Sequence, residues 1–135
     1  MARTCFGALL AGVVLTIWAG PAGAVQAPAL AALQKLEPGE WELRARGEDA
    51  ETRKICMRDP RQLLQIRHAR RNCKRFVIRD APDALAVTYD CGAAGNGRTD
   101  LRVETSRLVQ IRSQGVADSA PFAFAMEGRR TGACP

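Results

Sequence analysis

Cysteine is the residue type whose number and spacing predict the most specific chemistry in this chain. Cys5 lies near the start, and four further cysteines follow at positions 56, 73, 91 and 134. The N-terminus indicates an exported chain, as argued below, and signal cleavage would remove Cys5 and leave four cysteines. An even number of cysteines in a small exported chain is typical of paired disulfides. Structural zinc sites need closely spaced pairs, whereas these cysteines are separated by 17, 18 and 43 positions. We therefore predict that Cys56, Cys73, Cys91 and Cys134 form two disulfides and hold no metal.

The segment between Cys73 and Cys91 predicts which cysteines are paired. Apolar-rich runs at 76–78 and 85–89 flank the turn-forming sequence Asp80-Ala81-Pro82-Asp83, as in a β-hairpin. A hairpin folded symmetrically about this turn places Cys73 opposite Cys91, at a separation of about 4.5 to 5.5 Å that a disulfide can span. Cys56 would then pair with Cys134. The alternative, in which Cys56 pairs with Cys73 and Cys91 with Cys134, remains open at this stage.

A second concentration of chemistry-bearing residues lies just before this hairpin. Between positions 67 and 75, five residues are Arg or Lys, and His68 lies among them. Such a cluster suits an anionic partner: lipid headgroups, polyanionic envelope glycans or nucleic acid. Nucleic acid is the least favoured, because the chain is expected to be exported and offers few large aromatics for stacking. The alternative is a solvated helix C-terminus, where the dipole favours cations. The candidate anion-binding residues are Arg67, Arg70, Arg71, Lys74 and Arg75.

Catalytic chemistry has little support. His68 is the single histidine, so once the cysteines are bridged no Ser-His-Asp or Cys-His arrangement is available. Acidic residues gather at Asp80 and Asp83 and across 48–51, but these are turn segments, where acids favour turn formation and solubility. We expect a protein that is not an enzyme and needs no cofactor.

The glycine-rich segment 92–99 has the spacing of a phosphate-binding loop, with Arg98 in place of the lysine. Such a loop needs a helix immediately after it, so that backbone N–H groups hold the phosphates. An alternating run follows instead, which favours a flexible turn before a strand.

The N-terminus has the order of a secretory signal peptide. Arg3 is followed by an apolar run from Phe6 to Ala19 and by the small residues Ala22-Gly23-Ala24, which resemble a cleavage site. Because the run is shorter than the ~20 residues of a spanning helix, cleavage after Ala24 is favoured over a retained anchor. We predict a signal peptide over residues 1–24, a lead-in segment or short helix over 25–37 and one disulfide-linked domain over 38–135. The mature protein would be periplasmic or secreted, without a stable membrane anchor.

Short alternating runs separated by turn signals indicate a β-rich domain. In addition to the two hairpin runs, apolar and polar residues alternate at 41–45, 101–106 and 109–111, and large apolar residues alternate with alanines at 122–126. A further strand is expected at 52–57. The sequence Asp59-Pro60-Arg61-Gln62 favours a helix start, with Asp59 as the cap and Gln62 as its capping-box partner, and a helix running to about Arg71. The predicted fold class is mainly β: a seven-stranded antiparallel meander, as a curved sheet or a small barrel, with one short helix and two disulfides.

Four short motifs, taken in order, resemble the secreted bacterial domain-of-unknown-function 3617 family. They are Pro38-Gly39-Glu40-Trp41-Glu42, Cys56-Met57-Arg58-Asp59-Pro60, Tyr89-Asp90-Cys91 and Gly128-Arg129-Arg130-Thr131-Gly132-Ala133-Cys134. The resemblance implies export, a small β-rich domain and four cysteines, with no assigned activity or ligand. This chain differs in having Glu40 where such sequences usually place an apolar residue, and in strands richer in arginine.

These observations favour an exported, non-enzymatic domain whose basic face engages an anionic component of the envelope. The chain carries 20 Lys and Arg against 14 Asp and Glu, which agrees with an anionic partner. One alternative is a carrier whose strands close into a barrel around an apolar ligand, lined by residues such as Phe122, Phe124 and Val103. Another is an inhibitor of a secreted hydrolase.

Overall fold

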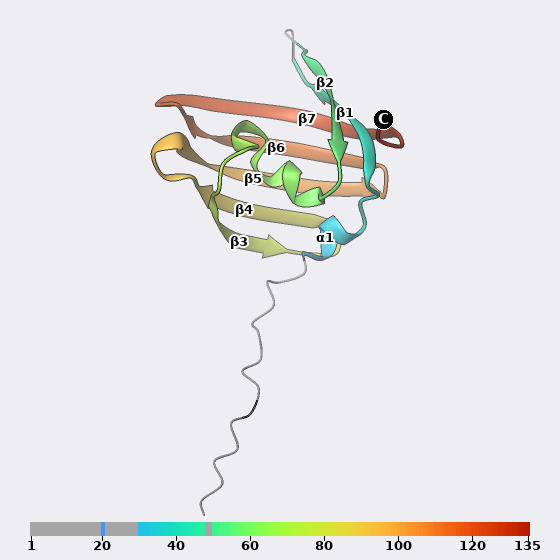
Figure 1. Cartoon of the computed structure of the whole chain (residues 1–135), viewed down its shortest axis with the longest axis horizontal. Helices are drawn as coiled ribbons and strands as arrows, with labels where there is room; N and C mark the ends of the chain where they lie inside the picture. The colour runs from blue at the N-terminus through green and yellow to red at the C-terminus, as the bar shows by residue number, and fades with distance from the viewer. Residues whose placement is uncertain (1–19, 21–29, 48–49) are drawn as a thin grey trace, which may run out of the picture.

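The computed structural model describes residue 20 and residues 30–47 and 50–135, and it contains one open sheet of seven antiparallel strands (Figure 1). The strands are β1 (Gly39–Ala45), β2 (Thr52–Met57), β3 (Lys74–Asp80), β4 (Ala84–Asp90), β5 (Gly95–Thr105), β6 (Leu108–Ala117) and β7 (Ala120–Gly132). Their order in the sheet is β2-β1-β7-β6-β5-β4-β3. The fold is therefore the open form of the predicted sheet, because β2 and β3 remain as its two edges. Apart from Gly20, the predicted signal peptide and lead-in residues 25–29 lie outside the described residues.

The connections of the sheet combine a meander with a returning hairpin. Strands β3 to β7 follow one another as neighbours, while the β1–β2 hairpin joins the sheet beside β7, with Trp41 opposite Arg130. The chain then passes from β2 at one edge to β3 at the other through η1 (Pro60–His68). This crossing places η1 over one face of the sheet, where it contacts β5 and β6 (Figure 1).

The covered face of the sheet holds the core. Inward-facing residues of the strands meet the apolar side chains of η1 and of the short helix α1 (Ala31–Gln34), which contacts β4, β5 and η1. The core includes Leu30, Ala32, Leu33, Leu36, Trp41, Leu43, Met57, Leu63, Leu64, Ile66, Leu85, Val87, Leu101, Val103, Val109 and Ile111. The packed domain thus includes residues 30–36, which the sequence assigned to the lead-in segment.

The helix before β3 begins as predicted and ends earlier. Asp59 accepts a hydrogen bond from the Arg61 N–H at 2.9 Å, and Gln62 accepts one from the Asp59 N–H at 3.3 Å, which completes the capping box. The element is a 3-10 helix that ends at His68, not a helix reaching Arg71. Gln65, with φ of −141° and ψ of 49°, interrupts the helical backbone, so η1 consists of two short helical pieces joined at a kink.

The β3–β4 hairpin has the predicted register. Val77 lies opposite Val87 and Arg75 opposite Tyr89, on either side of the turn at 81–83. The strand after the glycine-rich segment begins at Gly95, earlier than the predicted connection implied, and pairs with β4 from Asn96 onward. Among the described residues, no helix is long and apolar enough to cross a membrane.

Candidate functional site

The predicted basic cluster lies where η1 leads into β3. Its members are Arg67, Arg70, Arg71, Lys74 and Arg75, and all five residues are exposed. They are outward because η1 turns Leu63, Leu64 and Ile66 into the core and leaves the following residues at the surface. We call these five residues the basic cluster from here on.

The buried side chain of Gln65 holds parts of the basic cluster in place through hydrogen bonds. Its side chain is only 3% exposed, and its Nε2 donates to the backbone oxygens of His68 at 2.9 Å and Arg71 at 2.8 Å. Its Oε1 accepts from Nε and Nη2 of Arg75 at 2.9 and 2.7 Å. This buried amide therefore joins the end of η1 to β3, and Arg75 has a structural contact in addition to its place in the cluster.

The two disulfides hold both edges of the sheet. Cys73 is bonded to Cys91 and Cys56 to Cys134, with Cα atoms 4.3 and 5.4 Å apart. This is the pairing that hairpin symmetry favours, and it excludes the alternative. The first bond fixes the start of β3 beside the end of β4, and so anchors the basic cluster to the sheet.

The basic cluster lacks neutralising partners. None of its five cations forms a salt bridge with a carboxylate of the described residues. The uncovered face of the sheet differs, because its cations are largely paired: Arg44 with Glu42 at 2.9 Å, Lys54 with Glu40 at 3.2 Å, and Arg102 with Glu104 at 2.7 Å. The basic cluster therefore gathers five cations without a salt bridge in one short segment, while others, such as Arg79 and Arg112, lie elsewhere on the sheet.

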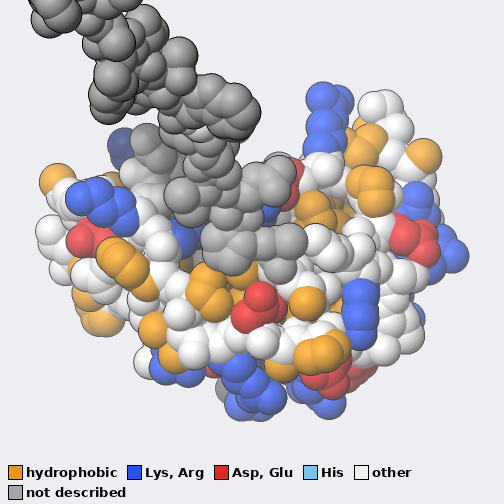
Figure 2. All heavy atoms as spheres, turned by 90° about the horizontal axis from the view of Figure 1, so that it is seen from below, with side chains coloured by type: hydrophobic (Ala, Val, Ile, Leu, Met, Phe, Trp, Pro, Cys, Tyr) orange, Lys and Arg blue, Asp and Glu red, His pale blue; other side chains and the backbone are white. Residues whose placement is uncertain are grey.

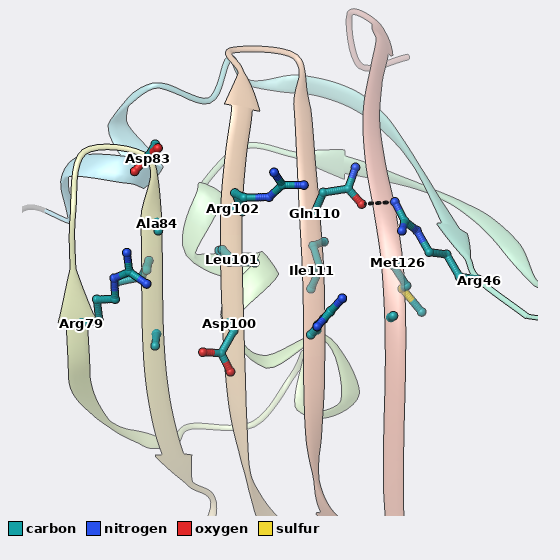
Figure 3. Close-up of a pocket in the computed structure, with 14 residues that line it drawn as sticks. Arg46, Arg79, Asp83, Ala84, Asp100, Leu101, Arg102, Gln110, Ile111 and Met126 are labelled. Carbon is teal, nitrogen blue, oxygen red and sulfur yellow. Dashed lines mark hydrogen bonds between the residues drawn. The ribbon is translucent and has the colours of Figure 1, made fainter.

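A groove of about 450 Å³ crosses the uncovered face of the sheet (Figure 3). The small residues Ala84, Ala86 and Ala125 form part of its lining, and longer polar side chains surround them. The polar lining residues are Arg46, Arg79, Asp83, Asp100, Arg102, Gln110 and Arg112. Arg46 reaches across from the end of β1 and donates to Gln110 of β6. The hollow arises because alanine side chains lie among long ones on this face.

This groove was not predicted from the sequence. The alternation on β5 could have indicated it: Arg98, Asp100 and Arg102 alternate with buried residues, so these three side chains lie on the face away from the core. Arg98, which lies outside the groove, donates to both carboxylate oxygens of Asp100 at 2.9 and 3.0 Å, while Arg102 of the lining pairs with Glu104. Among the described residues, Arg79 and Arg112 form no salt bridge.

Hydrogen bonds also hold acidic groups of the uncovered face in their charged form. The pKa of Glu40 is lowered by hydrogen bonds from Thr131 and Lys54. The pKa of Glu127 is lowered chiefly by hydrogen bonds from Gln110 and Arg129. These carboxylates therefore stay negative and balance cations of the uncovered face near neutral pH.

The arginines around His68 in the sequence suggested that it belongs to the exposed basic surface, but it does not. It is 5% exposed, with Nε2 at 2.9 Å from the backbone oxygen of Ala94 and Nδ1 at 3.2 Å from the hydroxyl of Tyr89. Because a carbonyl oxygen only accepts, Nε2 carries the hydrogen of this contact. The ring also packs edge-on against Tyr89 and Phe122. His68 is thus a fully hydrogen-bonded core residue between η1, β4 and the turn before β5.

The acidic candidates that the structure describes have different surroundings. Asp80 accepts a hydrogen bond from the Ala31 N–H at 3.1 Å, while Asp83 lines the groove on the uncovered face. Glu51 is exposed, and Glu48 and Asp49 lie outside the described residues. In the described part of the chain, no group of three His, Cys, Asp or Glu side chains is placed to hold a metal.

The glycine-rich segment leads into a strand, as predicted. The short 3-10 turn η2 (Gly92–Ala94) is followed directly by β5, so no helix N-terminus is present to bind phosphate there.

Two arginines near the C-terminus, Arg129 and Arg130, have partners within the domain. Arg129 pairs with Glu127 at 3.1 Å, and Arg130 donates to the Pro38 oxygen at 2.9 Å.

The residues proposed for an apolar ligand are divided between two places. Val103 lies in the packed core, whereas Phe122 and Phe124 lie on β7 with ring centroids 6.0 Å apart. These two rings line a cleft of about 380 Å³ that Ile66 and Arg67 of η1 border from the other side. The cleft is open and is not the interior of a barrel.

No family model matches this sequence, and no curated protein matches it.

Proposed function

We propose that this chain is an exported, periplasmic or secreted, non-enzymatic domain that binds an anionic envelope component through the basic cluster. The carrying observation is that five exposed cations gather at the junction of η1 and β3, without a salt bridge to a carboxylate of the described residues. Two disulfides, which form and persist in oxidising compartments, support export. The four motifs named above support membership of the domain-of-unknown-function 3617 family as part of this proposal.

The absence of catalysis is supported by the state of the chemical groups. His68 is buried with both ring nitrogens in hydrogen-bond contact, and the four described cysteines are bridged. A nucleophile–base pair of the usual kinds is therefore not available from these residues.

The proposal is tested by neutralising the basic cluster while Arg75, which holds Gln65, is kept. The variant Arg67→Gln/Arg70→Gln/Arg71→Gln/Lys74→Gln is compared with the wild type for binding to soluble sulfated dextran. Each lost cation is expected to weaken binding by about fivefold. The matched control neutralises four cations that have salt-bridge partners: Arg44, Lys54, Arg102 and Arg129. Equal weakening of the two variants, or of neither, would contradict a site at the basic cluster.

A second function is favoured by the cleft beside η1. Its aromatic lining and the adjacent Arg67 suit an amphiphile with an apolar body and an anionic head, as a carrier would bind. A native mass spectrum of protein from the exported fraction tests it: an adduct of lipid size, lost on denaturation, supports a carrier. A spectrum without adduct removes this second function.

A further inference from the structure

The edge strand β3 exposes a continuous apolar run. Phe76 is 59%, Val77 42% and Ile78 55% exposed, and every residue of β3 is exposed. Among the described residues, one further large hydrophobic side chain is comparably exposed, Val116 at 37% on β6. Single exposed apolar residues are ordinary, whereas three in succession on one edge indicate a surface that meets something other than water.

Cations border this apolar run on both sides. Lys74 and Arg75 precede it, Arg79 follows it, and the rest of the basic cluster lies at the adjoining end of η1. The acidic residue of the strand, Asp80, is engaged by the backbone N–H of Ala31. Figure 2, which views the molecule from the side of β3 and α1, shows hydrophobic side chains beside Lys and Arg side chains on this surface.

Two features argue against another β-strand as the occupant of this edge. The pairing of β3 with β4 shifts register between Val77 and Arg79, and such a bulge disturbs the regular edge that strand addition requires. In an antiparallel pair of two β3 strands centred on Val77, Lys74 would face Asp80 of the second copy but Arg75 would face Arg79, so this register brings no net charge attraction. The charge of this surface is instead complementary to an anionic layer.

We propose that the β3 edge and the basic cluster together dock onto a lipid surface with anionic headgroups. Phe76 and Ile78 enter the boundary between headgroups and acyl chains, and the cations lie at the level of the phosphates. Membrane-surface binding of this kind depends on buried apolar area together with attraction to anionic lipids. The inference rests on the proposed function, in which the basic cluster attracts an anionic partner. It adds the requirement that the apolar side chains of β3 also contact this partner.

The test separates the apolar contribution from the charge. Wild type, Phe76→Ser/Ile78→Ser and the control Val116→Ser are purified from the exported fraction, with the same N-terminus verified by mass. Each is sedimented with vesicles of phosphatidylcholine alone or with added phosphatidylglycerol, and each is titrated with soluble sulfated dextran. Because all variants share one N-terminus, the apolar run near the start of the chain cannot explain a difference between them.

The wild type and Val116→Ser are expected to bind the phosphatidylglycerol vesicles equally and the neutral vesicles weakly. Phe76→Ser/Ile78→Ser should bind the anionic vesicles about tenfold more weakly while binding sulfated dextran as the wild type does. Unchanged vesicle binding by this double variant, or a wild type that binds dextran but not anionic vesicles, overturns lipid docking and leaves the proposed function standing. If the variant Arg67→Gln/Arg70→Gln/Arg71→Gln/Lys74→Gln binds both sulfated dextran and anionic vesicles as well as the wild type does, the proposed function itself is overturned.

Discussion

At the scale of single residues, the polar end of the core is organised by Tyr89. Its ring is 1% exposed and lies against Gly97 on the neighbouring strand, where an added Cβ would meet the tyrosine hydroxyl at 2.5 Å. Its hydroxyl contacts His68. Nearby, the hydroxyls of Thr99 and Ser113 are paired at 2.9 Å. No buried side-chain polar atom of the described residues lacks a hydrogen-bond partner, so this polar end is structural.

Tyr89 is expected to make the fold sensitive to alkaline pH. Burial raises the pKa of Tyr89, with a smaller opposing effect from a hydrogen bond with Ser113. A raised folded-state pKa means that this contribution to stability is fully present below the ordinary tyrosine value of about 10 and is lost as the pH rises through the folded value. Since Tyr89 is the single tyrosine of the chain, tyrosinate absorbance reports on it alone.

The measurement is urea unfolding at a series of pH values from neutral to alkaline. The free energy of unfolding should fall with rising pH in the wild type and fall less steeply in Tyr89→Phe, which cannot ionise. A tyrosinate titration at the ordinary value in the folded protein, with equal slopes for both proteins, would contradict the burial argument.

At the scale of elements, the two disulfides are expected to contribute unequally. They close loops with sequence separations of 78 for Cys56–Cys134 and 18 for Cys73–Cys91. In the chain-entropy model, removing the disulfide that closes the longer loop lowers the free energy of unfolding by about 4.5 kcal/mol, and removing the other lowers it by about 3 kcal/mol. Urea unfolding of the two double alanine variants checks this order. A larger loss for the shorter loop would show that native-state contacts, and not loop entropy, decide the difference.

Elements defined by local sequence could be predicted, and those defined by distant pairing could not. The register of β3 with β4 and the bounds of β2 follow from turn chemistry and alternation over few residues. The pairing of β1 with β7 joins the two ends of the domain, and no local pattern encodes it. The kink of η1 at Gln65 accompanies hydrogen bonds from its side chain to the carbonyls of His68, at the end of the helix, and Arg71, beyond it, an arrangement that capping rules do not contain.

The candidate site shows the same division. The basic cluster could be predicted because its residues are close in sequence. The fate of His68 could not, since its burial depends on Tyr89 and Ala94, which follow it by 21 and 26 positions. The groove was missed because its lining comes from β3 to β7 together with Arg46, and only the sheet order places these residues together.

At the scale of the whole molecule, charge and apolar surface are separated into three regions. One face of the sheet is covered by α1 and η1, and the other carries largely paired charges. The β3 edge combines exposed apolar side chains with cations of the basic cluster. The basic cluster offers an anionic ligand five cations without a salt bridge, whereas the groove offers two, Arg79 and Arg112, beside the carboxylates of Asp83 and Asp100.

The most direct test of this account is to map the anion contact by NMR, with isotope-labelled, disulfide-bonded protein titrated with sulfated dextran. The backbone amide signals expected to move are those of residues 67–78, and their movement should weaken as salt is added. Movement concentrated at Arg46, Arg79 and Arg112 would place the anion in the groove and contradict a site at the basic cluster. Signals that do not move at any residue would contradict anion binding altogether.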